Sequence, residues 1–388
     1  MNVLLVRSAE FAVTPALPRF AAVLGDILPL GSVHALCWRT DPRVVTPFAC
    51  PQASVVHFEQ PVSSRSILSV LSVPLWWLRI WRELASRRHA IVQTSDVFSL
   101  FPVLIARRFF RYRVVADVRD HVGSIAGTHW GWKSALLGKV ERFLLTLSDK
   151  VVVVDDTRKE LVPPGIVRSG RVVVVRNVPL EDVNEDDETV RAGLVRVNYS
   201  GHLSAIRGAD MLLAAVVRAE ARLDVIGHIP DPDLRKRVEV NAAVDRYARM
   251  SHRDAMRRMK AADLVALLYD PAVIANRYAA PNKFYEAMML GRPVIACDGT
   301  PVADWAREHD CGWVVKYGDI AELTRVIRHV AENREEWRAK CANARRLYEA
   351  RFTWARESAA LAAVYRELLG QFTLQPQDYP ARRFDGGQ

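Results

Sequence analysis

Short apolar runs alternate with longer, partly polar stretches along most of the chain. In the first half the apolar runs are residues 2–6, 33–38, 90–93, 112–118, 151–154 and 172–175. Runs of this length, bounded by turn residues, are typical of strands buried on both faces of a parallel sheet. The stretches between them are long enough for helices, at 18–28, 67–84, 98–110 and 141–149. This alternation predicts an α/β fold with a doubly wound parallel sheet.

The second half repeats the pattern. Its apolar runs are residues 195–199, 223–227, 262–268, 293–297 and 312–315. Helical stretches are expected from 209, at 254–260, from 281, from 301, and at 320–331, 334–350 and 354–369. Between the halves lies the acidic stretch 181–188, EDVNEDDE, which predicts an exposed linker. The chain of 388 residues is long enough for two cores, so we place a domain boundary there.

The charge is uneven. Residues 1–184 hold 23 Lys and Arg against 15 Asp and Glu, which is +8 of the formal charge of +10. Such a balance suits nucleic acid, anionic lipid or a phosphorylated substrate. No nucleic-acid motif accompanies it, so we expect no nucleic-acid partner. The five cysteines are scattered without metal-ligand spacing, as in a cytosolic protein with reduced thiols, and no apolar stretch reaches transmembrane length.

The stretch 276–305 reads as one helix–strand–helix unit. Pro281 and Asn282 suit a helix start, and Gly291 stands where the helix would end. A buried strand and the turn Asp298-Gly299-Thr300-Pro301 follow, before the next helix. Parallel sheets bind ligands at the carboxyl ends of their strands, and helix N-termini attract phosphate.

Lys283 and Glu286 lie at the polar start of this helix. A carboxylate can accept two hydrogen bonds from a ribose diol, and an ammonium can neutralise a phosphate. The alternative is a solvated Lys and Glu on an ordinary helix.

A second candidate is the loop after the strand 195–199. Gly201 and Gly208 bracket it, which exposes backbone N–H groups to an anion, and Arg207 can add a charged contact. The alternative is a plain turn with an exposed Arg207.

In the first half, polar residues follow two neighbouring strands. Asp96 comes after 90–93, and Arg119, Asp120 and His121 come at the end of 112–118. We expect these side chains at one edge of the sheet. Asp120 can also be read as the cap of a helix.

The helical stretch 67–84 is rich in tryptophan and arginine. It carries Trp76, Trp77 and Trp81 beside Arg79 and Arg82. One interpretation is a helix packed in the core. The other is a face for the headgroup layer of a membrane, which the basic run 107–113 would extend.

Lys283, Glu286, Gly291 and the run Pro293-Val294-Ile295-Ala296 resemble the donor-site signature of retaining glycosyltransferases of family 4, which have the GT-B fold. The resemblance extends over nearly the whole chain. It implies two doubly wound Rossmann-like domains facing each other across a cleft, with an acceptor-side domain at 1–184 and a nucleotide-sugar domain at 185–353. A helix at 354–370 would cross back to the first domain, before a loose tail at 371–388.

The resemblance also implies roles. Glu286 would hold the ribose hydroxyls, while Arg207 and Lys283 would bind the diphosphate. The donor site would further include Gly201, His202, Gly299 and Thr300. Asp120, Arg119, His121 and Asp96 would line the acceptor side, with the first three as the catalytic candidates.

The chain departs from the family pattern at three places. The loop after the first strand has no Gly pair, His202 stands where an Arg is usual, and Tyr278 occupies the place of a first Glu. The resemblance also implies that no metal and no cofactor is required, and a cationic site without an Asp-x-Asp metal box is consistent with this.

We therefore expect a hexosyltransferase that moves a sugar from a nucleotide diphosphate-sugar to an acceptor hydroxyl. The expected acceptor is a lipid-linked glycan of bacterial surface polysaccharide synthesis, at the inner face of the cell membrane and in contact with anionic lipid. Two alternatives stay open: a nucleotide-sugar epimerase, and a non-catalytic binding partner.

Overall fold

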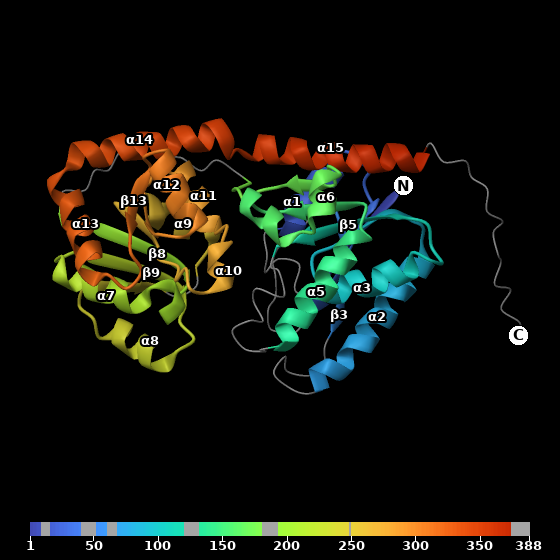
Figure 1. Ribbon diagram of the computed structural model, residues 1–388, viewed down its shortest axis with the longest axis horizontal. Coiled ribbons are helices and arrows are strands. Elements are labelled where there is room, and N and C mark those ends of the chain that lie inside the picture. Colours follow the sequence, from blue (N-terminus) through green and yellow to red (C-terminus); the bar gives the residue numbers. More distant parts are fainter. Residues whose placement is uncertain are drawn as a thin grey trace, which may run out of the picture. The chain divides into compact units, whose positions relative to one another are not determined.

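The computed structural model describes residues 1–8, 16–39, 52–59, 68–119, 132–180, 193–247 and 250–373 (Figure 1). The strands are β1 (Asn2–Arg7), β2 (Val33–Arg39), β3 (Ser54–Glu59), β4 (His89–Thr94), β5 (Arg113–Val118), β6 (Lys150–Val153), β7 (Val172–Val174), β8 (Arg196–His202), β9 (Arg222–His228), β10 (Val244–Tyr247), β11 (Leu264–Leu267), β12 (Val294–Cys297) and β13 (Gly312–Val315).

The α-helices are α1 (Ala16–Gly25), α2 (Leu68–Ser86), α3 (Val97–Ala106), α5 (Trp132–Thr146), α6 (Pro164–Arg168), α7 (Ala209–Arg218), α8 (Pro232–Glu239), α9 (His252–Lys260), α10 (Ile274–Arg277), α11 (Asn282–Met289), α12 (Pro301–Glu308), α13 (Ile320–Glu332), α14 (Arg334–Arg351) and α15 (Trp354–Thr373). Two 3₁₀ helices are η1 (Asp156–Leu161) and η2 (Ala205–Arg207).

The strands form two parallel sheets. Their orders are β3-β2-β1-β4-β5-β6-β7 and β10-β9-β8-β11-β12-β13. In each sheet the first strand lies inside, and the order reverses beside it, between β1 and β4 and between β8 and β11. Ligands of doubly wound sheets bind at such reversal points, beyond the carboxyl ends of the strands. The predicted fold class is confirmed.

The apolar runs are strands buried on both faces, as the pattern predicted. In β12, Ile295 and Cys297 belong to one apolar core, while Val294 and Ala296 belong to another on the opposite face. Because successive side chains of a strand point to opposite sides, only an unbroken apolar run fills both cores.

Five elements were not predicted, namely the strands β3 and β10 and the helices α6, α8 and α10. Both strands lie at a sheet edge, and β3 is exposed at its ends and half-buried between them. An edge strand has neighbours on one side only, so its composition is mixed and its signal is weak. The helix α5 also begins earlier than predicted, at Trp132.

The chain divides into two compact units. The first comprises Met1–Asp117, Leu144–Val152 and Ala360–Gln388, and the second comprises Val118–Phe143 and Val153–Ala359. This division differs from that of the sheets, because β7 belongs to the first sheet and to the second unit. The predicted linker at 181–188 lies outside the described residues. The predicted domain boundary therefore stays a prediction.

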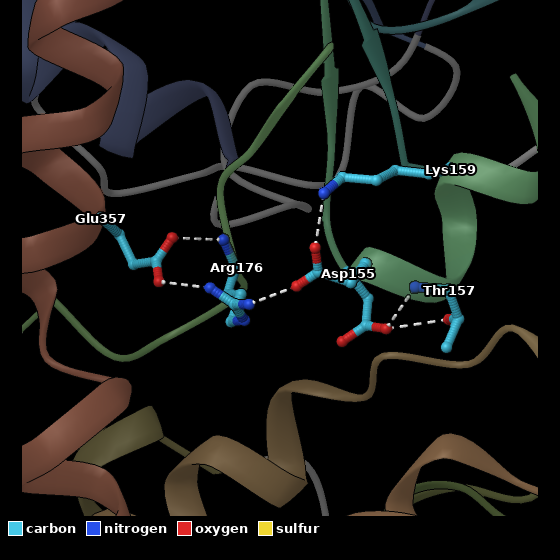
Figure 2. A network of polar contacts seen from close by, with 6 residues as sticks. Asp155, Thr157, Lys159, Arg176 and Glu357 are labelled. Carbon is cyan, nitrogen blue, oxygen red and sulfur yellow. Dashed lines mark hydrogen bonds and ion pairs between the residues drawn. The ribbon is translucent and has the colours of Figure 1, made fainter. Parts of the chain in front are cut away.

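The start of α15 is anchored within the second unit by a buried ion pair (Figure 2). The Arg176 backbone N–H donates to Glu357 Oε2 at 2.7 Å, and its guanidinium contacts Glu357 Oε1 at 3.3 Å and Asp156 Oδ2 at 2.6 Å. Further along α15, the Tyr365 hydroxyl donates to Gln93 Oε1 at 2.5 Å within the first unit.

The tryptophans of α2 pack against α3. The indole N–H groups of Trp76, Trp77 and Trp81 donate to Ser99 Oγ, Phe98 O and Pro102 O. Trp76 is fully buried, as a core helix requires, whereas Leu75 and Leu78 on the same helix are exposed. In the described part of the chain, no helix combines the length and the apolar character needed to cross a membrane.

Candidate functional site

The helix α11 forms and stops as its sequence indicated. Gly291 has a φ of 60°, and its N–H donates to Met288 O at 3.1 Å, while Arg292 N–H donates to Ala287 O at 2.8 Å. This pair of bonds is the Schellman motif, which needs a residue in the left-handed region and therefore favours glycine. The expected cap from Asn282 is absent, because Asn282 is already the first helical residue and no side chain caps the start at Pro281.

Glu286, on α11, is a buried carboxylate with two close polar partners. Its side chain is 6% exposed, and Lys283 Nζ lies 2.5 Å from Oε2. His252 Nε2, at the start of α9, lies 3.1 Å from Oε1. Burial favours the neutral acid, but Lys283 and His252 outweigh it and lower the pKa of Glu286 to about 2. At neutral pH the site therefore holds a buried carboxylate with a different partner on each oxygen.

Sequence reasoning missed His252. It lies 34 residues before Glu286, on another helix. A lone His at a helix start carries no local signal, so only the packing of α9 on α11 reveals it.

The loop after β8 is tied to the loop after β11. Ile206 O accepts from Asp270 N at 3.0 Å and from Asn276 Nδ2 at 3.1 Å. The Arg207 guanidinium carbon lies 5.5 Å from the centre of the Tyr269 ring. Arg207 thus lies at the reversal point between β8 and β11.

Two glycines at the ends of this loop differ in the space that a side chain would have. Gly208 has a φ of 71°, and a Cβ there would stand 2.5 Å from Leu268 Cβ and 2.8 Å from Leu268 O. Gly201, with a φ of 136°, has open space around it and is exposed. Gly208 thus permits the close approach of the two loops, whereas Gly201, in β8, leaves open space where a side chain would stand.

His202 is exposed and its ring lies 5.8 Å from that of His228. Burial, Arg207 and His228 each lower the pKa of His202. It is therefore neutral at pH 7 and does not replace the cation that the family pattern has at this position.

In the turn before α12, Thr300 and Gly299 form hydrogen bonds with neighbouring residues in the sequence. Thr300 is the helix cap: its hydroxyl donates to Cys297 O at 2.7 Å and accepts from Ala303 N at 3.4 Å. The Gly299 N–H donates to Asp298 Oδ1 at 3.0 Å. For Gly299 to assist a diphosphate, its N–H would first have to leave Asp298.

Of the four candidate site residues in the first half of the chain, the structure describes two. Asp96 caps α3, since Oδ1 accepts from Ser99 N and Oδ2 accepts from Ser8 N, both at 2.8 Å. Arg119 is buried and donates to Asn177 Oδ1. Asp120 and His121 lie outside the described residues. Asp96 thus has a structural role that explains it without an acceptor.

Tyr278 brings no carboxylate of its own to the place of the expected first Glu. Its hydroxyl donates to Glu160 Oε2 at 3.3 Å, and its carbonyl accepts from Arg158 Nε at 2.9 Å. In the described ranges, no group of three or more His, Cys, Asp or Glu residues is arranged to hold a metal ion.

The described part of the site combines a buried carboxylate on α11 with two cations, Lys283 and Arg207, at the carboxyl edge of one sheet. Residues 194–333, which include these side chains, match the family model described as Glycosyl transferases group 1. This part of the chain is a glycosyltransferase domain. No curated protein sequence matches it.

Solved structures show the fold of this glycosyltransferase. Sucrose-phosphate synthase from Thermosynechococcus elongatus is 16% identical, with a TM-score of 0.74 over 96% of this chain and 100% of that one. Anabaena HepE in complex with UDP-glucose is 15% identical, with a TM-score of 0.69 over 95% and 100%. WaaG, a glycosyltransferase involved in lipopolysaccharide biosynthesis, is 14% identical, with a TM-score of 0.66 over 93% and 99%. The fold is GT-B.

Proposed function

We propose that this glycosyltransferase moves a hexose from a nucleotide diphosphate-sugar to an acceptor hydroxyl with retention of configuration, as in family 4, and without a metal or cofactor. The observation that carries the donor assignment is Glu286, a buried carboxylate that stays ionised because Lys283 and His252 hold it. A ribose offers two adjacent hydroxyl donors to such a group, and the anionic diphosphate suits the cations beside it.

The chemistry follows from where charge develops. As the glycosidic bond breaks, negative charge grows on the leaving diphosphate. Lys283 and Arg207 would stabilise that charge, which takes the place of a metal ion. The HepE structure in complex with UDP-glucose supports a nucleotide-sugar donor by analogy.

We further propose that the acceptor is a lipid-linked glycan of bacterial surface polysaccharide synthesis, at the inner, cytoplasmic face of the membrane. The excess of +8 in residues 1–184 supports contact with anionic lipid. Exposed apolar side chains on α2 and α3 (Leu75, Leu78, Phe98 and Ile105) support the same contact. WaaG, which shares the fold, acts in lipopolysaccharide biosynthesis, and that description gives this proposal a precedent.

The test of the donor assignment is turnover of UDP-, GDP- and ADP-sugars by the wild type and by Glu286→Gln. The variant keeps the shape of the side chain but loses the charge, so we expect donor turnover to fall about a hundredfold or more with an unchanged melting temperature. Proton NMR of the product would show its anomeric configuration, which retention requires to be the same as that of the donor sugar. A Glu286→Gln variant with full activity would contradict the assignment.

The same assay separates the alternatives. Sugar isomerisation without acceptor would identify an epimerase. Absence of any nucleotide-induced rise in melting temperature would favour the non-catalytic binding partner, since a ligand of the native state must raise it.

A further inference from the structure

We propose that His252 is a positioning residue, which holds the Glu286 carboxylate in the orientation that receives the two hydroxyls of the donor ribose. The proposal rests on the nucleotide-sugar function argued above. It assigns a role to a residue that neither the motif nor the family pattern included.

The packing of two helices places His252. Ser251 caps α9, since its hydroxyl accepts from Asp254 N at 3.1 Å, so the helix begins at His252. Met256 and Met259 follow four and seven residues later, on the same face. Both are buried in one core with residues of α11, including Phe284 and Met288. His252 is thus the polar end of an apolar stripe that packs on α11.

Lys283 and His252 do not use all the hydrogen-bond acceptor sites of the Glu286 carboxylate. A carboxylate has about four acceptor sites, two on each oxygen. Lys283 occupies one on Oε2 and His252 one on Oε1. One acceptor site on each oxygen is left, which matches the two adjacent hydroxyls of a ribose. The plane of the carboxylate is set because each oxygen has its own donor.

The two partners differ in what they can do when the donor arrives. Lys283 has a long flexible stem and a point charge, so it can turn from Glu286 to the diphosphate. His252 has a short side chain at the start of a packed helix, and its ring stays with Glu286. A buried carboxylate that loses a donor pays its desolvation cost. His252 therefore keeps Glu286 both oriented and ionised while Lys283 serves the phosphate.

His252 can be removed without damage to the fold. Its side chain is 64% exposed, whereas that of Glu286 is 6% exposed. The substitution His252→Ala removes the donor to Oε1, and His252→Gln restores an N–H at a similar reach. Arg257→Ala is the matched control, because Arg257 lies on the same helix, is 58% exposed and contacts Asp254 instead.

The experiment measures KM for the donor sugar, kcat and calorimetric Kd for the four proteins. We expect His252→Ala to raise the donor KM and Kd about tenfold, which corresponds to one hydrogen bond to a charged group, with kcat within about twofold. His252→Gln should recover most of the affinity, and Arg257→Ala should match the wild type. Unchanged donor affinity in His252→Ala, or no recovery in His252→Gln, would overturn the proposal.

A double-mutant cycle isolates the contact. In a Glu286→Gln background, His252→Ala should cost little further donor affinity, because its partner charge is already gone. An equal loss in both backgrounds would show that His252 acts elsewhere and would overturn the proposal.

An NMR measurement on the nucleotide-free protein tests the contact between His252 and Glu286 separately from the proposed nucleotide-sugar function. The ¹⁵N NMR signals of the His252 ring should shift on Glu286→Gln if the two side chains are in contact. A shift together with no binding of any nucleotide sugar by the wild type would refute the proposed function and the ribose role, while leaving the contact intact. No shift, with donor binding intact, would refute only the positioning role.

Discussion

At the scale of single residues, two buried ionisable groups differ in their charge at neutral pH, because their partners differ. Glu286 is buried beside Lys283 and keeps its charge, with a pKa of about 2. His89, at the start of β4, is 3% exposed, and its ring lies 6.0 Å from that of His34. Burial, together with His34 and Arg87, lowers the pKa of His89 to about 4, although a backbone bond to Glu83 opposes this. Partners, rather than burial alone, decide which group stays charged.

His89 should make the protein less stable in acid. Its folded pKa lies below the unfolded value of 6.5, so the unfolded chain binds the proton more tightly. Its contribution is complete above pH 6.5 and is lost as the pH falls towards 4, by roughly 3 kcal/mol. Urea midpoints at pH 7.5 and 4.5 check this: His89→Gln should flatten the pH dependence. His228→Gln, which changes an exposed histidine, should leave it close to that of the wild type. An unchanged slope in His89→Gln would contradict the assignment.

At the scale of elements, one ion pair fixes the position of the first turn of α15. Glu357 lies three residues into α15, and 181 residues separate it from Arg176. Its side chain is 4% exposed, and burial raises its pKa although the Arg176 backbone N–H and guanidinium lower it. This pair holds the first turn of α15 to the segment after β7 (Figure 2).

Arg176→Met should destabilise the second unit strongly. It leaves a buried carboxylate without its cation, which costs about 3 kcal/mol. The matched control is Arg307→Met, which breaks an ion pair with Asp298 of 2.7 Å whose side chains are 51% and 60% exposed. Pairs of that kind contribute about 1 kcal/mol or less. Urea midpoints compare the two variants, and an equal fall in both would show that burial adds nothing to the Arg176 pair.

At the scale of the whole molecule, charge and exposed apolar surface coincide. The exposed charged residues of α2, of the turn after α2 and of the turn after α3 are all basic, namely Arg82, Arg87, Arg88, Arg108 and Arg111 among the described residues. Phe109 stands beside them and is 79% exposed. Basic and apolar groups together suit an anionic bilayer.

Reversing two of these charges should release the protein from anionic vesicles. Arg108→Glu with Arg111→Glu should weaken binding to phosphatidylglycerol vesicles by at least about tenfold at low salt, because each basic residue contributes about 1 kcal/mol. Arg325→Glu with Arg338→Glu, at exposed positions on α13 and α14, is the control for total charge. Co-sedimentation measures the bound fraction. If the wild type fails to sediment with these vesicles at low salt, the membrane part of the proposal is wrong.

Much of the donor site could be predicted from local sequence. The helix of Lys283 and Glu286, its end at Gly291 and the buried strand after it follow from capping and periodicity within a few residues. The spacing of three also places Lys283 and Glu286 on one face of that helix. The roles of two other local candidates stay predictions: the Asp96 carboxylate also caps a helix, and the pKa of His202 is lowered by burial, Arg207 and His228.

The sequence by itself determined the alternation of strands and helices, and with it two parallel doubly wound sheets, because side-chain periodicity reports burial directly. Only the tertiary structure decided which distant groups meet. His252 reaches Glu286 through the packing of α9 on α11, and Gly208 is required by Leu268, which lies on a neighbouring loop. Arg176 finds Glu357 across 181 residues. Such pairs leave no local pattern, because each depends on which elements become neighbours after folding.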